Sequence, residues 1–378
     1  MHKALLILSI FCVFSSLAGA QTLDLRLITP LPSMLEETSG IESNEGKSFW
    51  THNDGGDGPN FYKLDTLGKV IRIIKLNSAI NKDWEDVTQD SLHNFYIADF
   101  GNNDNNRQEL KIYKIPNPDS ISTDTITPRT IWFTYPEQKK FPPDDTKKNY
   151  DAEAIIAFNN SLYIFTKNRT VPFSGYTYLY KLPNVPGSYQ AQLLDSFKTG
   201  SGLKEQWWIT GADISPDNKT LVLLSYDKMF VFTDFTGDNF FKGKVKQVQL
   251  NSFTQKEAIV FISNQEFFVT DEFYSLFGGR NLYLGDLRNI KTIKVNTPKK
   301  KENKLIRIQV SQGENVIHLE DLQQTVEITI TDLSGRTLKT FVLNKDQSKQ
   351  ILELRNGVYI ITASDGVNVQ NVYRYIGN

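Results

Sequence analysis

The chain has 378 residues, of which 39% are hydrophobic and 22% charged, and its formal net charge is −1. This composition is typical of a globular protein with enough length for a large core, and the balanced charge shows none of the basic excess expected of a nucleic-acid-binding protein. With 24 Phe and 16 Tyr the sequence is rich in aromatic residues, which favours β-strands.

Residues 1–20 have the features of a secretory signal peptide. A basic start at residues 2–3 precedes a nearly continuous apolar or small stretch at residues 4–17, and residues 18–20 read Ala-Gly-Ala, a small-x-small cleavage pattern. We expect the mature chain to begin at Gln21. A transmembrane anchor is the alternative, but it would need about 20 apolar residues, and we expect no membrane span in the mature chain.

The only cysteine, Cys12, lies within this segment, after Phe11, which is too bulky for a typical lipoprotein cleavage site. The mature chain therefore has no disulfide, and an exported protein without one must be held by its core or by metal.

A short pattern recurs five times along the next part of the chain, at intervals of about 45–70 residues. Each copy has a polar residue, then a small or acidic one, then an aliphatic residue or alanine, as in "TSGIES", "WEDVTQ", "AEAIIA", "ITGADIS" and "KEAIVF". Aligning the copies superposes Ser39, Glu85, Glu153, Thr210 and Glu257.

Each anchor is followed by an apolar segment that ends in polar residues, such as "FWTHNDGG" or "FYIADFGNN", and most units contain a third strand such as "LKIYKI". Such units are typical of propeller blades. The sequence predicts an all-β protein with a five-bladed β-propeller over residues 21–291, or six blades if the long second unit hides one. "TLDLRLITPL", near the start, could supply the fourth strand that the last unit lacks.

In a propeller the first strand of each blade lines the central channel, so three glutamates would converge. Two carboxylates about 4 Å apart repel by about 1 kcal/mol in water and roughly 4 kcal/mol at an effective dielectric constant of about 20. Raised pKa values of the glutamates are one way to offset this repulsion, and a calcium ion held by oxygen donors is another. The absence of His and Cys among the anchors disfavours zinc. The alternative is that each glutamate hydrogen-bonds to the backbone of a neighbouring blade.

The anchors carry a resemblance. "SGIES", "WEDV", "AEAI", "ITGAD" and "KEAI" are similar to motifs of the calcium-dependent apyrases, secreted nucleotidases with one calcium ion on the axis of a five-bladed propeller. The resemblance implies that Ser39, Glu85, Glu153, Thr210 and Glu257 are calcium ligands, although Thr210 stands where a serine is expected. "FWTHNDGG", "DWEDV", "FGNN…R" and "DAEA" resemble more closely a group of exported bacterial propellers without an established activity.

The polar ends of the second strands should lie together on one face, where loops commonly carry function. His52 beside Asp54 could act as a general base, and we take His52, Asp54 and Asp99 as candidate catalytic residues. Lys167 and Arg169 could hold an anionic group such as phosphate. The alternative is a solvated rim of turn-forming residues. The candidate ligand-binding residues are Asn53, Asn102, Asn103, Arg107, Lys167, Arg169, Tyr226, Asp271 and Glu272.

No G-x-S-x-G elbow, Walker loop or H-E-x-x-H motif occurs in the sequence. Trp207 and Trp208 could stack on a sugar or base, but packing between blades is the simpler interpretation.

Residues 292–303 lose the apolar pattern and gain a lysine run, which predicts a linker. Residues 304–378 contain seven short alternating segments, which predict a small β-sandwich. "VEITITDLSGRTLKTF", "LELRNGVYIITASDG" and "NVQNVYRYIGN" resemble the type IX secretion sorting domain, although its usual Pro-Asn-Pro is absent. The resemblance implies a type IX-like secretion machinery as partner, and an ordinary adhesive sandwich is the alternative.

Two functions remain open at this stage. One is an exported, extracellular or cell-surface hydrolase that uses calcium and acts on phosphoesters or nucleotides. The other is a non-catalytic binding or scaffold propeller at the cell surface, with a small-molecule or glycan ligand. The fold cannot decide between them.

Overall fold

The structure is a computed structural model. The predicted signal peptide and residues 293–303 of the predicted linker lie outside the described residues. The structure describes residues 21–43, 46–274, 278–292, 307–311, 316–320, 325–332, 337–344, 349–351, 357–364 and 369–376.

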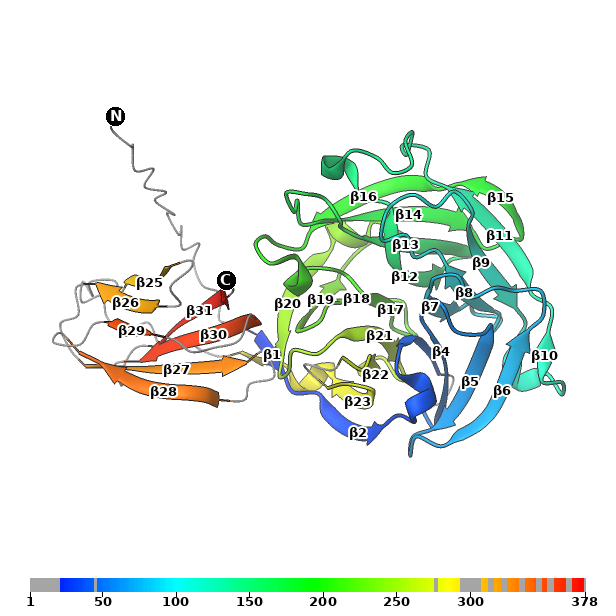
Figure 1. Cartoon of the computed structure of the whole chain (residues 1–378). Helices are drawn as coiled ribbons and strands as arrows, with labels where there is room; N and C mark the ends of the chain where they lie inside the picture. The colour runs from blue at the N-terminus through cyan, green and yellow to red at the C-terminus, as the bar shows by residue number, and fades with distance from the viewer. Residues whose placement is uncertain are drawn as a thin grey trace.

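Within the described residues, five sheets surround a common centre (Figure 1). The inner strand of each sheet contacts the inner strand of the next, and β21 contacts β3, so the ring is closed. The predicted all-β propeller fold is therefore confirmed. The inner strands are β3 (Thr38–Glu42), β7 (Trp84–Gln89), β12 (Asp151–Phe158), β17 (Gly211–Ile214) and β21 (Lys256–Phe261).

Each inner strand pairs antiparallel with a second strand that is buried along most of its length. The second strands are β4 (Ser48–Asn53), β8 (Phe95–Asp99), β13 (Ser161–Lys167), β18 (Thr220–Leu224) and β22 (Glu266–Asp271). The third strands are β5 (Asn60–Asp65), β9 (Leu110–Ile115), β14 (Tyr176–Pro183), β19 (Lys228–Thr233) and β23 (Asn281–Asp286).

The outer strand of the last sheet comes from the start of the chain. There β2 (Arg26–Pro30) pairs antiparallel with β23 and joins the two ends of the ring, as the sequence predicted for "TLDLRLITPL". The other four outer strands are β6 (Val70–Leu76), β11 (Arg129–Thr134), β16 (Gln192–Lys198) and β20 (Lys244–Leu250).

Three sheets gain a further strand in parallel with the outer one, which covers an otherwise open edge. β10 (Thr125–Ile126) pairs with β6, β15 (Gly187–Gln190) with β11, and β1 (Gln21–Leu23) with β20. β1 also pairs antiparallel with β24 (Lys291–Thr292).

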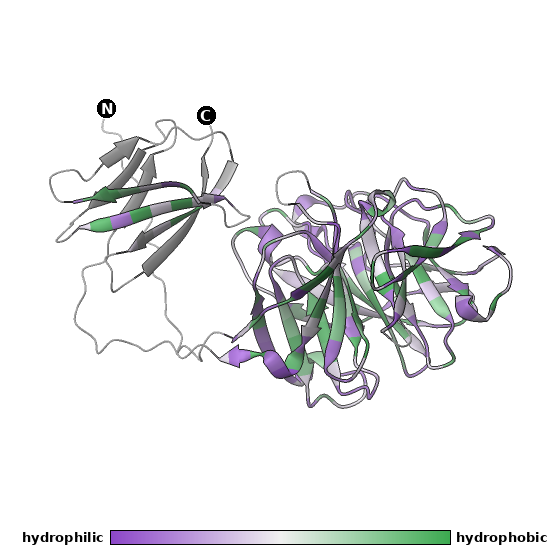
Figure 2. Ribbon diagram, turned by 90° about the horizontal axis from the view of Figure 1, so that it is seen from below, coloured by the Kyte–Doolittle hydropathy of each residue, from purple (hydrophilic) through white to green (hydrophobic). Residues whose placement is uncertain are grey.

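Each pair of neighbouring sheets shares a hydrophobic cluster. Because both faces of every sheet meet a neighbour, the second strands are apolar on both sides, and Figure 2 shows hydrophobic residues along the propeller strands and hydrophilic residues in the loops. Among the described residues no helix is long and apolar enough to cross a membrane. The described helical segments are short 3-10 turns, η1 (Ser33–Leu35), η2 (Pro118–Ser120), η3 (Asp145–Lys147), η4 (Lys204–Gln206), η5 (Phe240–Lys242) and η6 (Leu287–Asn289).

The described residues after 306 form two separate sheets. Val326, Ile328 and Ile330 are fully buried at alternate positions, as expected for a strand with one face against a second layer. One sheet has the order β25 (Arg307–Ser311), β26 (Val316–Glu320), β29 (Lys349–Ile351), and the other β28 (Thr337–Leu343), β27 (Val326–Asp332), β30 (Gly357–Ser364), β31 (Val369–Ile376).

Candidate metal centre

Four of the five anchor residues occupy the same structural irregularity. In β7 the pairing with β8 passes from Trp84 directly to Asp86, so Glu85 is the extra residue of a β-bulge. Ser39, Glu153 and Glu257 occupy the equivalent position in β3, β12 and β21. A bulge turns one side chain out of the regular alternation of a strand. The motif that recurs in the sequence therefore corresponds, in four of the five blades, to a β-bulge at the start of the inner strand.

The two anchor hydroxyls connect neighbouring blades. Ser39 Oγ donates to the backbone oxygen of Glu85 at 2.5 Å, and Thr210 Oγ1 donates to that of Lys256 at 2.6 Å. Neither residue lines the pocket described next. The structure therefore divides the predicted ligand ring into three glutamates that reach the pocket and two hydroxyls that are engaged in hydrogen bonds between blades.

A pocket of about 190 Å³ lies at the end of the channel where the anchor glutamates of the inner strands gather. We call it the mouth pocket. Carboxylates outnumber cationic side chains in its wall by five to two, so the pocket favours a positively charged ligand. Its lining residues are Asp54, Glu85, Asn103, Glu153, Lys167, Arg169, Trp208, Tyr226, Gln255, Glu257 and Glu272.

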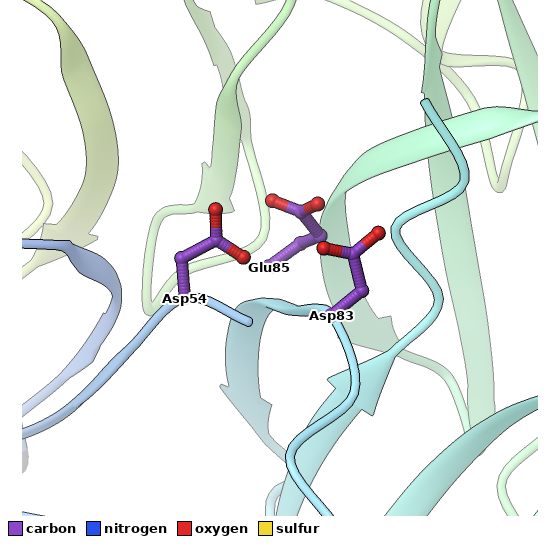
Figure 3. Close-up of side chains that lie close together, drawn as sticks. All are labelled: Asp54, Asp83 and Glu85. Atoms are coloured by element: carbon purple, nitrogen blue, oxygen red, sulfur yellow. The ribbon is translucent and has the colours of Figure 1, made fainter. Parts of the chain in front are cut away.

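The first carboxylate triad consists of Asp54, Asp83 and Glu85, which come from the segment after β4 and the start of β7 (Figure 3). One oxygen from each lies within 4.8 Å of the others. Oxygens on opposite sides of a calcium ion are about 4.6–5.2 Å apart, since each calcium–oxygen distance is about 2.3–2.6 Å. The spacing of the triad therefore suits one such ion.

Two glycines allow these carboxylates to approach. A Cβ on Gly101 would overlap the carboxylates of Glu85 and Asp83, and a Cβ on Gly55 would lie 2.7 Å from the backbone oxygen of Lys82 and 2.8 Å from Asp83 Oδ1. Both glycines belong to the segments "NDGG" and "FGNN". Their role is to leave space for the triad rather than only to form turns.

The pKa values of the triad are raised by burial first and by the crowding of like charge second. Burial, with a contribution from Asp83, raises the pKa of Asp54 to about 7, and burial, with a contribution from Asp151, raises the pKa of Asp83 to about 6. Burial and the nearby Asp54 and Glu153 raise the pKa of Glu85 well above its usual range. A cation is the group that would reverse these shifts.

The second triad shares Glu85 and adds Asp151 and Glu153, which are all buried. This triad already has cationic partners in the protein. Lys167 Nζ lies 2.9 Å from Glu153 Oε2, and Arg169 Nε lies 2.6 Å from Asp151 Oδ2. Arg169 Nη2 is also 3.4 Å from Glu153 Oε1. The positive charge predicted for binding an anion is thus paired within the site.

Glu257 and Glu272 border the other side of the mouth pocket. Glu257 is 2% exposed, and its Oε2 has no hydrogen-bond partner among the described residues. Glu272 accepts a short hydrogen bond from Gln255. Burial raises the pKa of both glutamates, and Glu257 adds to the shift of Glu272.

His52 does not reach the pocket. Its side chain is fully buried, its ring lies 5.5 Å from that of Trp84, and burial lowers its pKa to about 4. A neutral, enclosed imidazole cannot collect a proton from a ligand in the mouth pocket, so the structure gives no support to its predicted role as a general base.

Several other predicted residues are placed in structural networks outside the pocket. Asp99 is fully buried between Arg107 Nη2 and Lys111 Nζ, both at 2.8 Å. Asn53 donates to the backbone oxygen of Met34. Asn102 and Asp271 are similarly engaged, Asn102 with the backbone oxygen of Tyr150 and Asp271 with Asn281 and Tyr283. Of the predicted face, the pocket retains Asp54, Asn103, Lys167, Arg169, Tyr226 and Glu272.

Asp83, Asp151 and Gln255 are members of the site that the sequence prediction omitted. A local signal for the two acids was present, because "DWE" and "DAE" each place an aspartate two residues before an anchor glutamate. Gln255 has no such signal.

A second layer of acids lies deeper in the channel. Asp86 accepts hydrogen bonds from the backbone of Val87 and, across blades, of Ile155 at 2.9 Å. Asp213 likewise accepts from Phe261 at 2.6 Å, and Glu42 from Gln89 at 3.0 Å. These three residues fill the blade-bridging role that the sequence prediction considered for the anchor glutamates.

The fold and the mouth pocket define a β-propeller with a carboxylate-rich centre. The sequence matches no protein-family model and no curated protein.

Solved structures with a similar arrangement include an aldose sugar dehydrogenase from Streptomyces coelicolor, with 7% identity over 72% of this chain and 99% of that chain at a TM-score of 0.45. The β-propeller domain of Cps50 (Swd1) from Myceliophteria thermophila has 8% identity over 69% and 99%, at a TM-score of 0.37. PorZ, a surface component of the type-IX secretion system of Porphyromonas gingivalis, has 11% identity over 90% of this chain and 45% of that chain, at 0.31. At such identities the likeness concerns the fold alone.

Proposed function

We propose that the protein is an exported β-propeller that binds one calcium ion in its mouth pocket, and that the ion serves the hydrolysis of a phosphoester. The observation that carries the proposal is the triad of Asp54, Asp83 and Glu85, whose oxygens lie within 4.8 Å of one another. Glu257 adds a buried carboxylate oxygen without a partner among the described residues of the same pocket.

The donor chemistry supports calcium over other common metals. The lining residues offer carboxylate, amide and phenol oxygens but no His or Cys, and hard oxygen ligands suit Ca²⁺ or Mg²⁺ rather than Zn²⁺. The three carboxylates come from two separate segments, and such an irregular arrangement fits the flexible coordination of calcium better than the octahedral demands of magnesium.

When bound, the ion would supply Lewis-acid stabilisation of charge on a phosphoryl oxygen. The chain itself contributes the residues that hold the ion and a wall that contains Lys167 and Arg169. These two cations border the space that an anionic group would enter.

A non-catalytic binding propeller is the second candidate, and a specific observation favours it. Both Lys167 and Arg169 are ion-paired with acids of the pocket, and no histidine lines it among the described residues. In this case calcium would stabilise the centre of the ring and the loops around it would bind the partner.

Export is part of the proposal and is supported by the sequence of residues 1–20 and by the resemblance of residues 304–378 to a type IX sorting domain. Deletion of residues 304–378 should leave the propeller in the periplasm. Normal levels of the shortened protein in the medium would contradict the sorting role.

The test of the metal site is calorimetric titration of the chelator-treated protein with calcium, which should show one site. Asp83→Asn should weaken binding strongly. Asp104→Asn is the matched control, because this aspartate is exposed on the loop after β8, and it should bind like the unaltered protein. Equal binding by both variants would place the ion elsewhere.

The same preparations should be assayed against phosphate esters, nucleotides and glycans, with calcium and with chelator. Calcium-dependent release of phosphate that Asp83→Asn abolishes supports the hydrolase. Calcium binding without turnover of any substrate in the panel supports the binding propeller.

A further inference from the structure

The two carboxylate triads of the mouth pocket have similar acids but different neighbours. The first triad has Arg107 as its nearest cation, with Nη1 4.0 Å from Asp83 Oδ2. That guanidinium is already engaged, because it donates to the backbone oxygen of Gly101 at 2.7 Å and to Asp99 at 2.8 Å. The second triad instead has two cations in direct contact with it.

We propose that Glu85, Asp151 and Glu153 form a second cation subsite that the chain fills with its own Arg169 and Lys167, so that the pocket accepts one divalent cation and not two. The inference deepens the proposed function and rests on it for the first site. The two acids that belong to this triad alone already contact cationic side chains: Asp151 contacts Arg169, and Glu153 contacts both Lys167 and Arg169. Glu85, which both triads share, has no such contact among the described residues.

The resident cations are held in place by the fold. The backbone N–H of Arg169 donates to Lys148 at 2.9 Å, and its guanidinium lies 4.5 Å from the ring centroid of Trp208. Trp208 is itself fixed by a 2.5 Å hydrogen bond from Nε1 to the backbone oxygen of Asn168. A cation–π contact with this ring adds to the attraction of the carboxylates, so the guanidinium is positioned before any ligand arrives.

Lys167 completes the arrangement from the end of β13. Its backbone pairs with Asp151 at the start of β12, and its side chain is only 6% exposed. Nζ lies 2.9 Å from Glu153 Oε2 and 5.2 Å from the ring of Trp208. Among the five aligned strand-end positions, only this one carries a lysine, and the others are His52, Asp99, Tyr226 and Asp271. The asymmetry of the pocket therefore comes from one blade.

An unpartnered oxygen shows that this compensation is incomplete. Glu257 lines the same pocket, is 2% exposed, and leaves Oε2 without a partner among the described residues. Its charge adds to the field at Glu153. Removing Arg169 would leave a second triad whose oxygens lie within 4.8 Å of one another, as in the first. Asp151 Oδ1 would still accept a hydrogen bond from the backbone N–H of Asn102 at 2.7 Å, and a metal ion could take the place of the guanidinium.

The experiment is to count bound calcium by equilibrium dialysis with elemental analysis, supported by terbium luminescence, in the full chain and in Arg169→Gln. The unaltered protein should bind one ion and Arg169→Gln two. Arg169→Lys keeps a cation and should bind one. Arg169→Gln combined with Asp151→Asn removes the positive charge together with one acid, and it should also bind one.

The outcomes separate this inference from the proposed function. One ion in both the unaltered protein and Arg169→Gln overturns the second subsite and leaves the first intact. No ion in the unaltered protein but one in Arg169→Gln supports the second subsite and overturns the first. No ion in either protein overturns both.

If Arg169→Gln folds poorly, its melting curve gives the answer. Rescue of its midpoint by calcium, greater than the calcium effect on the unaltered protein, supports the inference. The absence of rescue, while Arg169→Gln with Asp151→Asn folds normally, contradicts it.

Discussion

Two layers of carboxylates lie in the channel of this propeller, and they differ in what their oxygens contact. The deep layer, formed by Glu42, Asp86 and Asp213, accepts backbone hydrogen bonds from the next blade. Among the described residues, Asp54 at the mouth accepts from Gly55 in its own segment, and Glu85 has no hydrogen bond from a neighbouring blade, whereas Asp151 does accept one, from the backbone of Asn102.

The difference shows how to separate structural acids from acids that can hold a ligand. Burial raises the pKa of both kinds, since burial is the first cause for Asp86 and for Asp54. The source of the hydrogen bonds distinguishes them: an acid satisfied by the backbone holds blades together, whereas an acid surrounded by other acids must either keep a proton or bind a cation. The predictions below test this distinction from the largest expected effect to the smallest.

The largest effect is expected in the deep layer. Asp86→Ala leaves the backbone N–H groups of Val87 and Ile155 without their acceptor. It should lower the free energy of unfolding by roughly 3 kcal/mol, because each buried donor left without a partner costs about 1–3 kcal/mol. Urea unfolding in chelator measures the change.

The matched variant in the mouth pocket is Asp54→Asn. It keeps an oxygen that can accept the hydrogen bond from the backbone N–H of Gly55, and it removes the repulsion between this side chain and the neighbouring carboxylates. Its stability in chelator should stay within about 0.5 kcal/mol of the unaltered protein or rise. If both variants lose the same stability, the two layers do not differ in the way described.

The next effect is stabilisation by calcium. At a hundredfold excess over the dissociation constant, an ion that binds only the folded protein adds about 2.7 kcal/mol to the free energy of unfolding. Glu85→Gln should remove most of this gain, because Glu85 belongs to both triads. Glu153→Gln should remove less, since Lys167 and Arg169 already pair with this residue. Thermal melting with calcium and with chelator measures both, and the reverse order would assign the ion to the second triad.

The third test concerns the space around the first triad. Gly101→Ala places a methyl group against the carboxylates of Glu85 and Asp83, and it should weaken calcium binding about tenfold or more, as do changes next to metal ligands in general. Calorimetric titration gives the affinity. The unfolding midpoint in chelator serves as the control, and unchanged affinity would mean that the triad tolerates displacement.

The fourth test is the pH dependence of stability. The folded-state pKa values of Asp54 and Asp83, about 7 and about 6, exceed the ordinary value of 3.8. The folded protein therefore holds protons that the unfolded chain releases, and the resulting stability is present at low pH and lost as pH rises through 6 to 7.

In chelator the melting temperature should fall between pH 5 and pH 8, by about 3 °C or more. Saturating calcium should reduce this dependence of the melting temperature on pH, because the ion favours the ionised form of the mouth acids. Burial also raises the pKa of Asp213, in the deep layer, to about 7. Its contribution to the pH dependence should persist in calcium. A slope that calcium leaves unchanged would assign all of it to the deep layer.

The smallest effect is expected outside the ring. β2 and β1 already complete the last two sheets, and β24 ends at Thr292. A protein of residues 21–292 should therefore unfold at the same midpoint as the full chain, because every strand of the five propeller sheets lies within these residues. A much lower midpoint would show that the C-terminal residues support the ring.

The sequence alone was sufficient for the repeat and for much of the pocket. Period-two apolar segments and recurring turns predicted the propeller, and aligning the repeats predicted the mouth residues Glu85, Glu153 and Glu257 together with Lys167 and Arg169. These are local patterns, since a strand and its bulge are determined within a few residues.

Only the tertiary structure decided which of these residues are available to a ligand. His52 and Asp99 lie at the ends of their strands, as Lys167 does, yet His52 packs against Trp84 and Asp99 pairs with Arg107. Ser39 has its partner 46 residues away in the chain and Asp86 has its partner 69 residues away. A repeat in the sequence determines where a side chain starts, but whether its oxygen is satisfied depends on a neighbouring blade that only the closed ring brings within hydrogen-bonding distance.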